Sequence, residues 1–156
     1  MAEIKELDLD KKVNVKSIAD WPTGFNRIVD GVGDVTIQRR GTVRLSRNEI
    51  ISQVQRGNKL FTGTDGLGSH ATLYIDDAET RVECGFDTEE AKQTIFSDAL
   101  VKTLFGYKTI KTFESKLSEM IVTRAEKAAL VEAIRRLHLN DYDKIKRVIA
   151  YTGFDI

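Results

Sequence analysis

Residues 42–75 read TVRLSRNEIISQVQRGNKLFTGTDGLGSHATLYI, and this stretch decides the fold that the sequence predicts. Its pattern predicts a strand, one short helix, a second strand, a glycine-rich loop and a third strand. Ser46 and Glu49 stand in the S-x-x-E relation of a capping box, in which each side chain accepts a backbone N–H of the other residue. The predicted helix therefore covers residues 46–56, and Gly57 follows as its left-handed C-terminal cap.

Short β-like segments surround this helix. They alternate apolar and polar residues or are rich in β-branched and aromatic residues. The predicted strands are 13–18, 25–29, 35–38, 42–46, 59–62, 71–75 and 80–84. Several short strands at close spacing predict a small antiparallel barrel or sandwich arranged as a meander, with an SH3-like barrel as the specific expectation.

The sequence after residue 86 is typical of helices. Asp87 or Thr88 is expected to cap the first of them, and Thr123 and Glu126 form a second capping box. Gly153 follows the last apolar stripe and is expected to end the final helix. Three or four C-terminal helices are therefore predicted.

The chain divides into three parts on this pattern. Residues 1–12 form an N-terminal arm, residues 13–86 a β-rich domain with the inserted helix, and residues 87–156 a helical region. Segregated strands and helices define the α+β class.

Composition limits the classes of function. Acidic and basic residues balance at 24 each among 156 residues, so no strong overall field directs the protein to DNA or to an anionic membrane, although a local basic patch stays open. The single cysteine, Cys84, excludes an intramolecular disulfide and a multi-cysteine zinc site. No apolar run approaches the roughly 20 residues that span a bilayer, and residues 1–12 lack a signal-peptide core. We expect a location in an intracellular compartment or in a particle assembled there, neither secreted nor in a membrane.

Residues 63–70, GTDGLGSH, form the most glycine-rich loop. Glycine amides can cradle phosphate, but the loop lacks the lysine and the following helix of a P-loop. A flexible hairpin between two strands is the structural interpretation, and recognition of a partner by close backbone approach is the functional one. The candidate partner-binding residues here are Gly63, Asp65, Gly66, Gly68 and His70.

Five arginines around the central helix form the second candidate group. They are Arg39, Arg40, Arg44, Arg47 and Arg56. In a meander some of them share a face and meet phosphate or a carboxylate-rich partner, whereas interspersed acids favour an ordinary solubilising surface. A second basic group, at residues 135–147, is open to the same two interpretations.

No catalytic constellation stands out. Asp65, Ser69 and His70 supply a carboxylate, a hydroxyl and an imidazole, but contiguous residues of one loop seldom give the geometry of a triad. Asp76 and Asp77 lack the glycine and the ligand spacing of a calcium loop. We expect no enzyme activity, no cofactor and no metal site.

Two blocks resemble small, mostly uncharacterised proteins encoded among the head-assembly genes of tailed bacteriophages. They are TVRLSRNEIISQVQRGNKLFTGTDGLGSHATLYIDD at 42–77 and TRAEKAALVEAIRRLHLNDYDKIKRVIAYTGF at 123–154. No motif in them assigns chemistry, so the resemblance implies a virion or assembly role and no site residue. We therefore expect a structural or interaction protein, a capsid-associated auxiliary, decoration or head-assembly component. Its partner would be a capsid or other virion protein, with homo-oligomers left open. The alternative is a small nucleic-acid-binding module that uses the arginines at 39–56.

Overall fold

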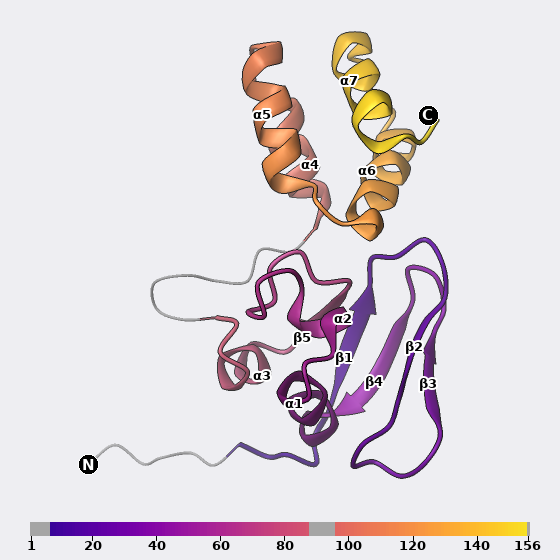
Figure 1. Cartoon of the computed structure of the whole chain (residues 1–156), viewed down its shortest axis with the longest axis vertical. Coiled ribbons are helices and arrows are strands. Elements are labelled where there is room, and N and C mark those ends of the chain that lie inside the picture. Colours follow the sequence, from indigo (N-terminus) through magenta and orange to yellow (C-terminus); the bar gives the residue numbers. More distant parts are fainter. Residues whose placement is uncertain (1–6, 88–95, 156) are drawn as a thin grey trace, which may run out of the picture.

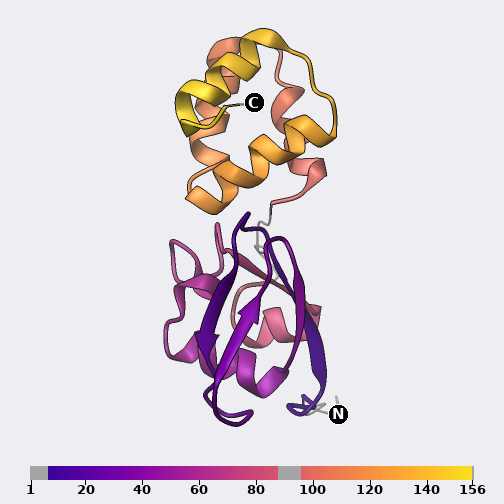
Figure 2. The ribbon, with the colours of Figure 1, turned by 90° about the vertical axis from the view of Figure 1, so that its right-hand side faces the viewer.

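The computed structural model describes residues 7–87 and 96–155, which form two lobes stacked along the long axis (Figures 1 and 2). We call residues 7–87 the β lobe and residues 96–155 the helical lobe. The β lobe contains β1 (Lys12–Ser17), β2 (Thr23–Asn26), β3 (Asp34–Ile37), β4 (Thr42–Ser46), α1 (Arg47–Gln55), α2 (Lys59–Thr62), β5 (Leu73–Asp76) and α3 (Ala78–Glu83). The helical lobe contains α4 (Asp98–Phe105), α5 (Ile110–Met120), α6 (Arg124–Arg136) and α7 (Tyr142–Thr152). The predicted α+β class is confirmed.

A three-stranded antiparallel sheet in the order β4-β1-β5 is the centre of the β lobe. Val15 of β1 lies opposite Val43 on one side and Ile75 on the other. Because side chains alternate along a strand, Val13 and Val15 are buried while the charged residues of β1 face solvent. The small antiparallel sheet that the sequence predicted is therefore present.

The predicted barrel is not. β2 and β3 pair with each other as a separate hairpin, in which Phe25 lies opposite Val35, and the described strands form no closed barrel. The chain is not a sequential meander either, because β1 takes β4 and β5 as its two neighbours. The hairpin joins the core through the side chains of Phe25, Val35 and Ile37 rather than through backbone pairing. The specific SH3-like arrangement is not confirmed.

Two predicted strands are helices. Residues 59–62 form α2, capped by Asn58, whose side chain accepts from the Leu60 N–H. Residues 78–83 form α3, capped by Asp77, whose side chain accepts from the Thr80 N–H. In both segments a local side-chain cap outweighs the β propensity of the residues that follow it.

Helix α1 is confirmed, but only half of its predicted capping box exists. Ser46 Oγ accepts from the Glu49 N–H at 3.0 Å, and Gly57 adopts the left-handed conformation with φ of 76°. The Glu49 carboxylate does not return to Ser46. It bonds instead to the backbone of residues 28–30, so a tertiary contact replaces the local one.

The helical lobe has its own hydrophobic core. α4, α5, α6 and α7 enclose a cluster whose fully buried members include Leu104, Phe113, Leu130 and Ile134. The Thr123–Glu126 capping box is confirmed, and Gly153 ends α7 with φ of 75°. The first cap of the helical region was predicted at Asp87 or Thr88, but residues 88–95 lie outside the described residues, and α4 is capped by Ser97. Within the described ranges, no helix is long and apolar enough to cross a membrane.

Candidate interaction surfaces

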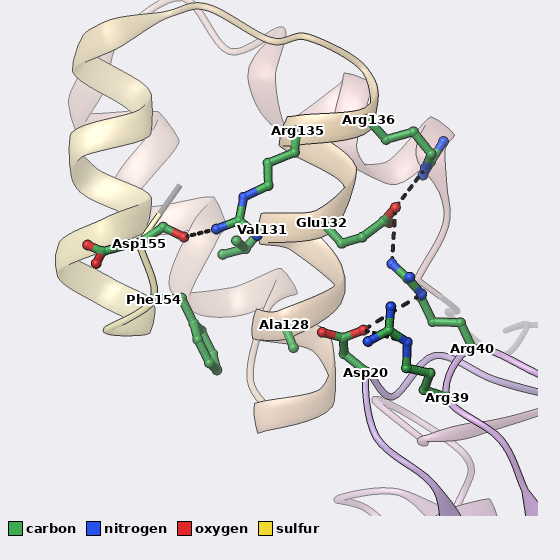
Figure 3. A pocket seen from close by; sticks show the side chains of 10 residues that line it. All are labelled: Asp20, Arg39, Arg40, Ala128, Val131, Glu132, Arg135, Arg136, Phe154 and Asp155. Carbon is green, nitrogen blue, oxygen red and sulfur yellow. Dashed lines mark hydrogen bonds and ion pairs between the residues drawn. The ribbon is translucent and has the colours of Figure 1, made fainter.

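A cavity of about 550 Å³ lies where the β lobe meets helix α6 (Figure 3). We call it the interlobe cavity. The β lobe contributes Asp20, Arg39 and Arg40, and the helical lobe contributes Ala128, Val131, Glu132, Arg135, Arg136, Phe154 and Asp155. Two arginine pairs that are far apart in the sequence therefore meet in one hollow.

Local structure explains why these side chains converge. Arg39 and Arg40 lie in the β3–β4 turn, where Arg40 adopts the left-handed conformation with φ of 51° and its N–H donates to the Ala19 carbonyl at 2.8 Å. The lining residues of α6, which fall between 128 and 136, recur every three or four positions. This spacing puts them on one face of the helix.

Two of the four arginines are matched by carboxylates. Arg40 Nη1 lies 3.1 Å from Glu132, and Arg40 Nε lies 3.8 Å from Asp20. Arg136 makes a two-pronged contact with Asp98, at 2.6 and 2.8 Å, and also contacts Glu132 at 3.2 Å. Hydrogen bonding to Asp98 raises the pKa of Arg136, and the same bond lowers the pKa of Asp98.

The other two arginines keep donors available. The side chain of Arg39 is 62% exposed, and its Nε lies 4.0 Å from Asp20, which Arg40 approaches more closely. Arg135 donates to the Asp155 carbonyl at 2.5 Å and has no ion pair with a carboxylate of the described residues. Guanidinium N–H groups that lack a close carboxylate within the protein can donate hydrogen bonds to a carboxylate of a ligand.

Two further contacts fix the β lobe against α6. His70 Nδ1 lies 2.9 Å from both oxygens of Glu126, a buried side chain that also accepts from the Thr123 N–H. The guanidinium of Arg124 lies 5.8 Å from the ring centre of Trp21. His70, a predicted partner-binding residue, is therefore used inside the molecule.

The glycine-rich loop also uses its polar groups in hydrogen bonds with its own backbone and with that of α2. Asp65 accepts from the N–H of Leu67 at 2.7 Å and of Ser69 at 3.2 Å. Partial desolvation alone would raise the pKa of Asp65, but hydrogen bonds from Ser69 and Leu67 outweigh it and the pKa is lowered. The N–H groups of Gly63, Thr64 and Gly68 donate to backbone carbonyls. The loop connects α2 to β5, so the predicted hairpin between two strands is wrong, and these bonded amides do not form a phosphate cradle.

The remaining predicted site residues are dispersed. Gly66 lies at the exposed tip of the same loop with φ of 78°. Arg47 is buried and bonds to Asp77 at 3.0 and 3.3 Å, which removes it from the surface. Hydrogen bonding to Asp77 raises the pKa of Arg47.

Arg44 lies on the outer face of β4, and Arg56 is exposed at the end of α1. Of the five arginines around the central helix, only Arg39 and Arg40 share a site.

Sequence reasoning missed a second surface, the tip of the β2–β3 hairpin, residues 27–33. Val32 is 98% exposed and Val29 is 43% exposed. Gly31 and Gly33 flank Val32 with φ of 112° and 103°, a conformation that favours glycine. The signal in the sequence was a valine between two glycines, in the connection between the predicted strands 25–29 and 35–38.

A buried carboxylate holds this tip in place. Glu49 is fully buried and accepts from the N–H groups of Ile28 at 2.8 Å, Val29 at 3.3 Å and Asp30 at 3.4 Å. Asp30 in turn accepts from Ser46 Oγ at 2.6 Å. Helix α1 therefore determines the position of a loop whose apolar side chains face solvent.

The described residues offer little reactive chemistry. Burial, and then the neighbouring Glu83, raise the pKa of Cys84 to about 11, so its thiol is protonated at neutral pH. Among the residues that the structure describes, no three His, Cys, Asp or Glu side chains are grouped to hold a metal ion. Cys84 is the C-cap residue that follows α3, and it does not lie in the strand that the sequence predicted.

Comparisons with known proteins add no relative. The chain matches no protein-family model, and no curated protein or solved structure gives a significant match.

Proposed function

We propose that this protein is a non-enzymatic interaction protein that docks on a larger assembly through the tip of its β2–β3 hairpin. The observation that carries the proposal is the 98% exposure of Val32 on a loop anchored by the buried Glu49. The resemblance of residues 42–77 and 123–154 to proteins from phage head-assembly genes suggests the assembly. It would be a tailed-bacteriophage capsid, with this protein as an auxiliary, decoration or head-assembly component.

The anchored tip suits docking for an energetic reason. An apolar side chain in water gains free energy when a partner covers it, about 25 cal/mol for each Å² of apolar area buried. A loop already held by hydrogen bonds loses little further conformational entropy on binding. Val29 and Val32 are therefore exposed apolar side chains on an anchored loop, each suited to an apolar depression on a protein partner.

The chemistry of the chain supports a non-enzymatic role. Catalysis needs a nucleophile or an acid–base pair positioned in a cavity. Among the described residues, the interlobe cavity is lined by arginines, by Asp20 and Glu132, which pair with arginines, by Asp155 and by apolar side chains, and not by serine, cysteine or histidine. The Cys84 thiol is not activated.

A nucleic-acid-binding module is the second candidate. The observation on its side is the outer face of the sheet, where Lys12, Lys16 and Arg44 are exposed. Against it, Lys16 pairs with Asp76 at 3.3 Å, and the arginines at 39–56 do not form one basic surface. Binding of this kind would weaken steeply with salt, which a titration of duplex DNA at two salt concentrations measures.

Mass spectrometry of gradient-purified phage particles tests the first proposal. The particles come from host cells that produce this chain, either wild type or with Val32→Ser. We expect the wild type at a fixed copy number per particle and a reduction of at least about tenfold for Val32→Ser, because the buried contact is lost. The matched control is Val82→Ser, which changes another exposed valine, on α3, and should leave the copy number unchanged. Absence of the wild-type chain from the particles would refute the capsid role.

A further inference from the structure

We propose that the interlobe cavity binds an acidic peptide segment of a protein partner. This inference rests on the proposed function and names a second contact with the partner. The segment would place one carboxylate at Arg39 and another at Arg135, with an apolar side chain against Ala128 and Val131 between them.

The available charge in the cavity favours carboxylates. Arg40 and Arg136 are already paired with Glu132 and Asp98, so they position other groups rather than receive a ligand. Arg39 and Arg135 are the two lining cations with weak or no carboxylate contact among the described residues. Each could form a charge-assisted hydrogen bond with an incoming carboxylate.

The placement of these groups favours an extended ligand over a compact anion. Figure 3 shows the guanidinium groups of Arg39 and Arg135 well apart in the cavity, with Val131 beside Arg135 and with Ala128 and the carboxylate of Asp20 between the two arginines. A single phosphate could contact only one of these two guanidinium groups. A peptide instead offers carboxylates at separate points and backbone N–H groups to the acids of the cavity.

The size and the lining of the cavity fit a short peptide. A volume of about 550 Å³ lies within the range of pockets that bind small ligands. Phe154, together with Ala128 and Val131, gives an apolar surface for one aliphatic side chain. Alternation of acidic and apolar residues is therefore the pattern that the cavity recognises.

Titration of the full chain with a defined probe tests this inference. The probe is an acetylated and amidated pentapeptide of alternating aspartate and leucine, and its control has asparagine in place of aspartate. The only tryptophan, Trp21, is adjacent to Asp20 of the cavity and reports binding by fluorescence. We expect the acidic peptide to bind and the asparagine peptide to bind at least about tenfold more weakly.

Arginine variants locate the site. Arg39→Gln and Arg135→Gln should each weaken binding of the acidic peptide about tenfold. Arg56→Gln is the matched control, because Arg56 is exposed and is not one of the residues that line the cavity. Circular dichroism of each variant confirms that it is folded before the titration.

Three results would overturn the inference. They are equal affinity for the two peptides, equal effects of Arg39→Gln, Arg135→Gln and Arg56→Gln, and displacement of the peptide by inorganic phosphate or a thymidine oligonucleotide at equal concentration. The last result would make the cavity a general anion site. None of them bears on the docking role, because the particle measurement with Val32→Ser does not depend on peptide binding.

Discussion

Two glycine-containing loops of the β lobe, residues 27–33 and 63–70, use the same conformational freedom in opposite ways. The first loop is held from outside, by the carboxylate of Glu49, and displays Val32 to solvent. The second loop is held from inside, by Asp65 and its own backbone, and ends at His70, which contacts Glu126 of α6. The more glycine-rich loop, 63–70, therefore makes contacts within the protein, whereas loop 27–33 exposes an apolar side chain to which a partner could bind.

This difference shows that glycine content alone does not identify the loop that is available to a partner. Positive φ values occur in both loops, so glycine is required in both for conformational reasons. The two loops differ in the hydrogen-bond partners of their polar groups and in how exposed their apolar side chains are. The following predictions test that separation, beginning with the largest expected effect.

Removal of the external anchor should have the largest effect. Glu49→Ala leaves three backbone N–H groups and the Gln53 amide without their buried acceptor. We expect the free energy of unfolding to fall by about 4 kcal/mol, because each buried unsatisfied donor costs about 1–3 kcal/mol and water recovers part of this. Urea unfolding followed by circular dichroism measures it. Glu83→Ala, at an exposed glutamate of α3, is the control, and a loss below about 1 kcal/mol for Glu49→Ala would contradict the anchoring role.

The second loop should be sensitive at one glycine and tolerant at another. A Cβ at Gly63 would lie 2.0 Å from the Ser69 carbonyl oxygen, whereas a Cβ at Gly66 meets nothing within 4 Å. Both residues have positive φ, so both alanine variants are strained. We expect Gly63→Ala to cost about 3 kcal/mol and Gly66→Ala about 1 kcal/mol, measured by thermal unfolding. Equal costs would mean that the loop does not pack against itself.

Asp65 should give the second loop a weak dependence on pH. Its pKa in the folded protein is lowered, so its contribution to stability is present above its unfolded pKa of about 3.9 and is lost as the pH falls through the folded value. Because Asp65 is exposed to solvent, we expect Asp65→Asn to cost only about 0.5–1 kcal/mol at pH 7. Unfolding of both proteins in urea at pH 7 and pH 3 should show the difference shrinking at low pH. A difference that grows on acidification would be inconsistent with the lowered pKa.

The displayed valine should matter least to stability. Val32→Ser removes a side chain that is 98% exposed and makes no core contact, so we expect a change below about 0.5 kcal/mol in the free energy of unfolding. The same variant is expected to lose its place in the particle. A large loss of stability would show that the tip is structural and that the two loops do not differ in role.

The sequence by itself determined the local elements whose signals are complete within a few residues. The Ser46 cap and Gly57 define α1, the Thr123–Glu126 box starts α6, and Gly153 ends α7. In each case the hydrogen bonds or the left-handed conformation involve residues close in the chain. The alternation of Val13 and Val15 likewise identified β1.

Tertiary structure decided the rest, because it depends on contacts between distant residues. The choice of β4 and β5 as partners of β1, the turn of Glu49 toward the hairpin and the burial of Arg47 against Asp77 bring together positions some 20 to 60 residues apart. Arg39 and Arg135 are identical in chemistry to Arg47. The guanidinium groups of Arg39 and Arg135 are available to a ligand because the fold places no close carboxylate of the described residues beside them. The sequence near each arginine does not predict this.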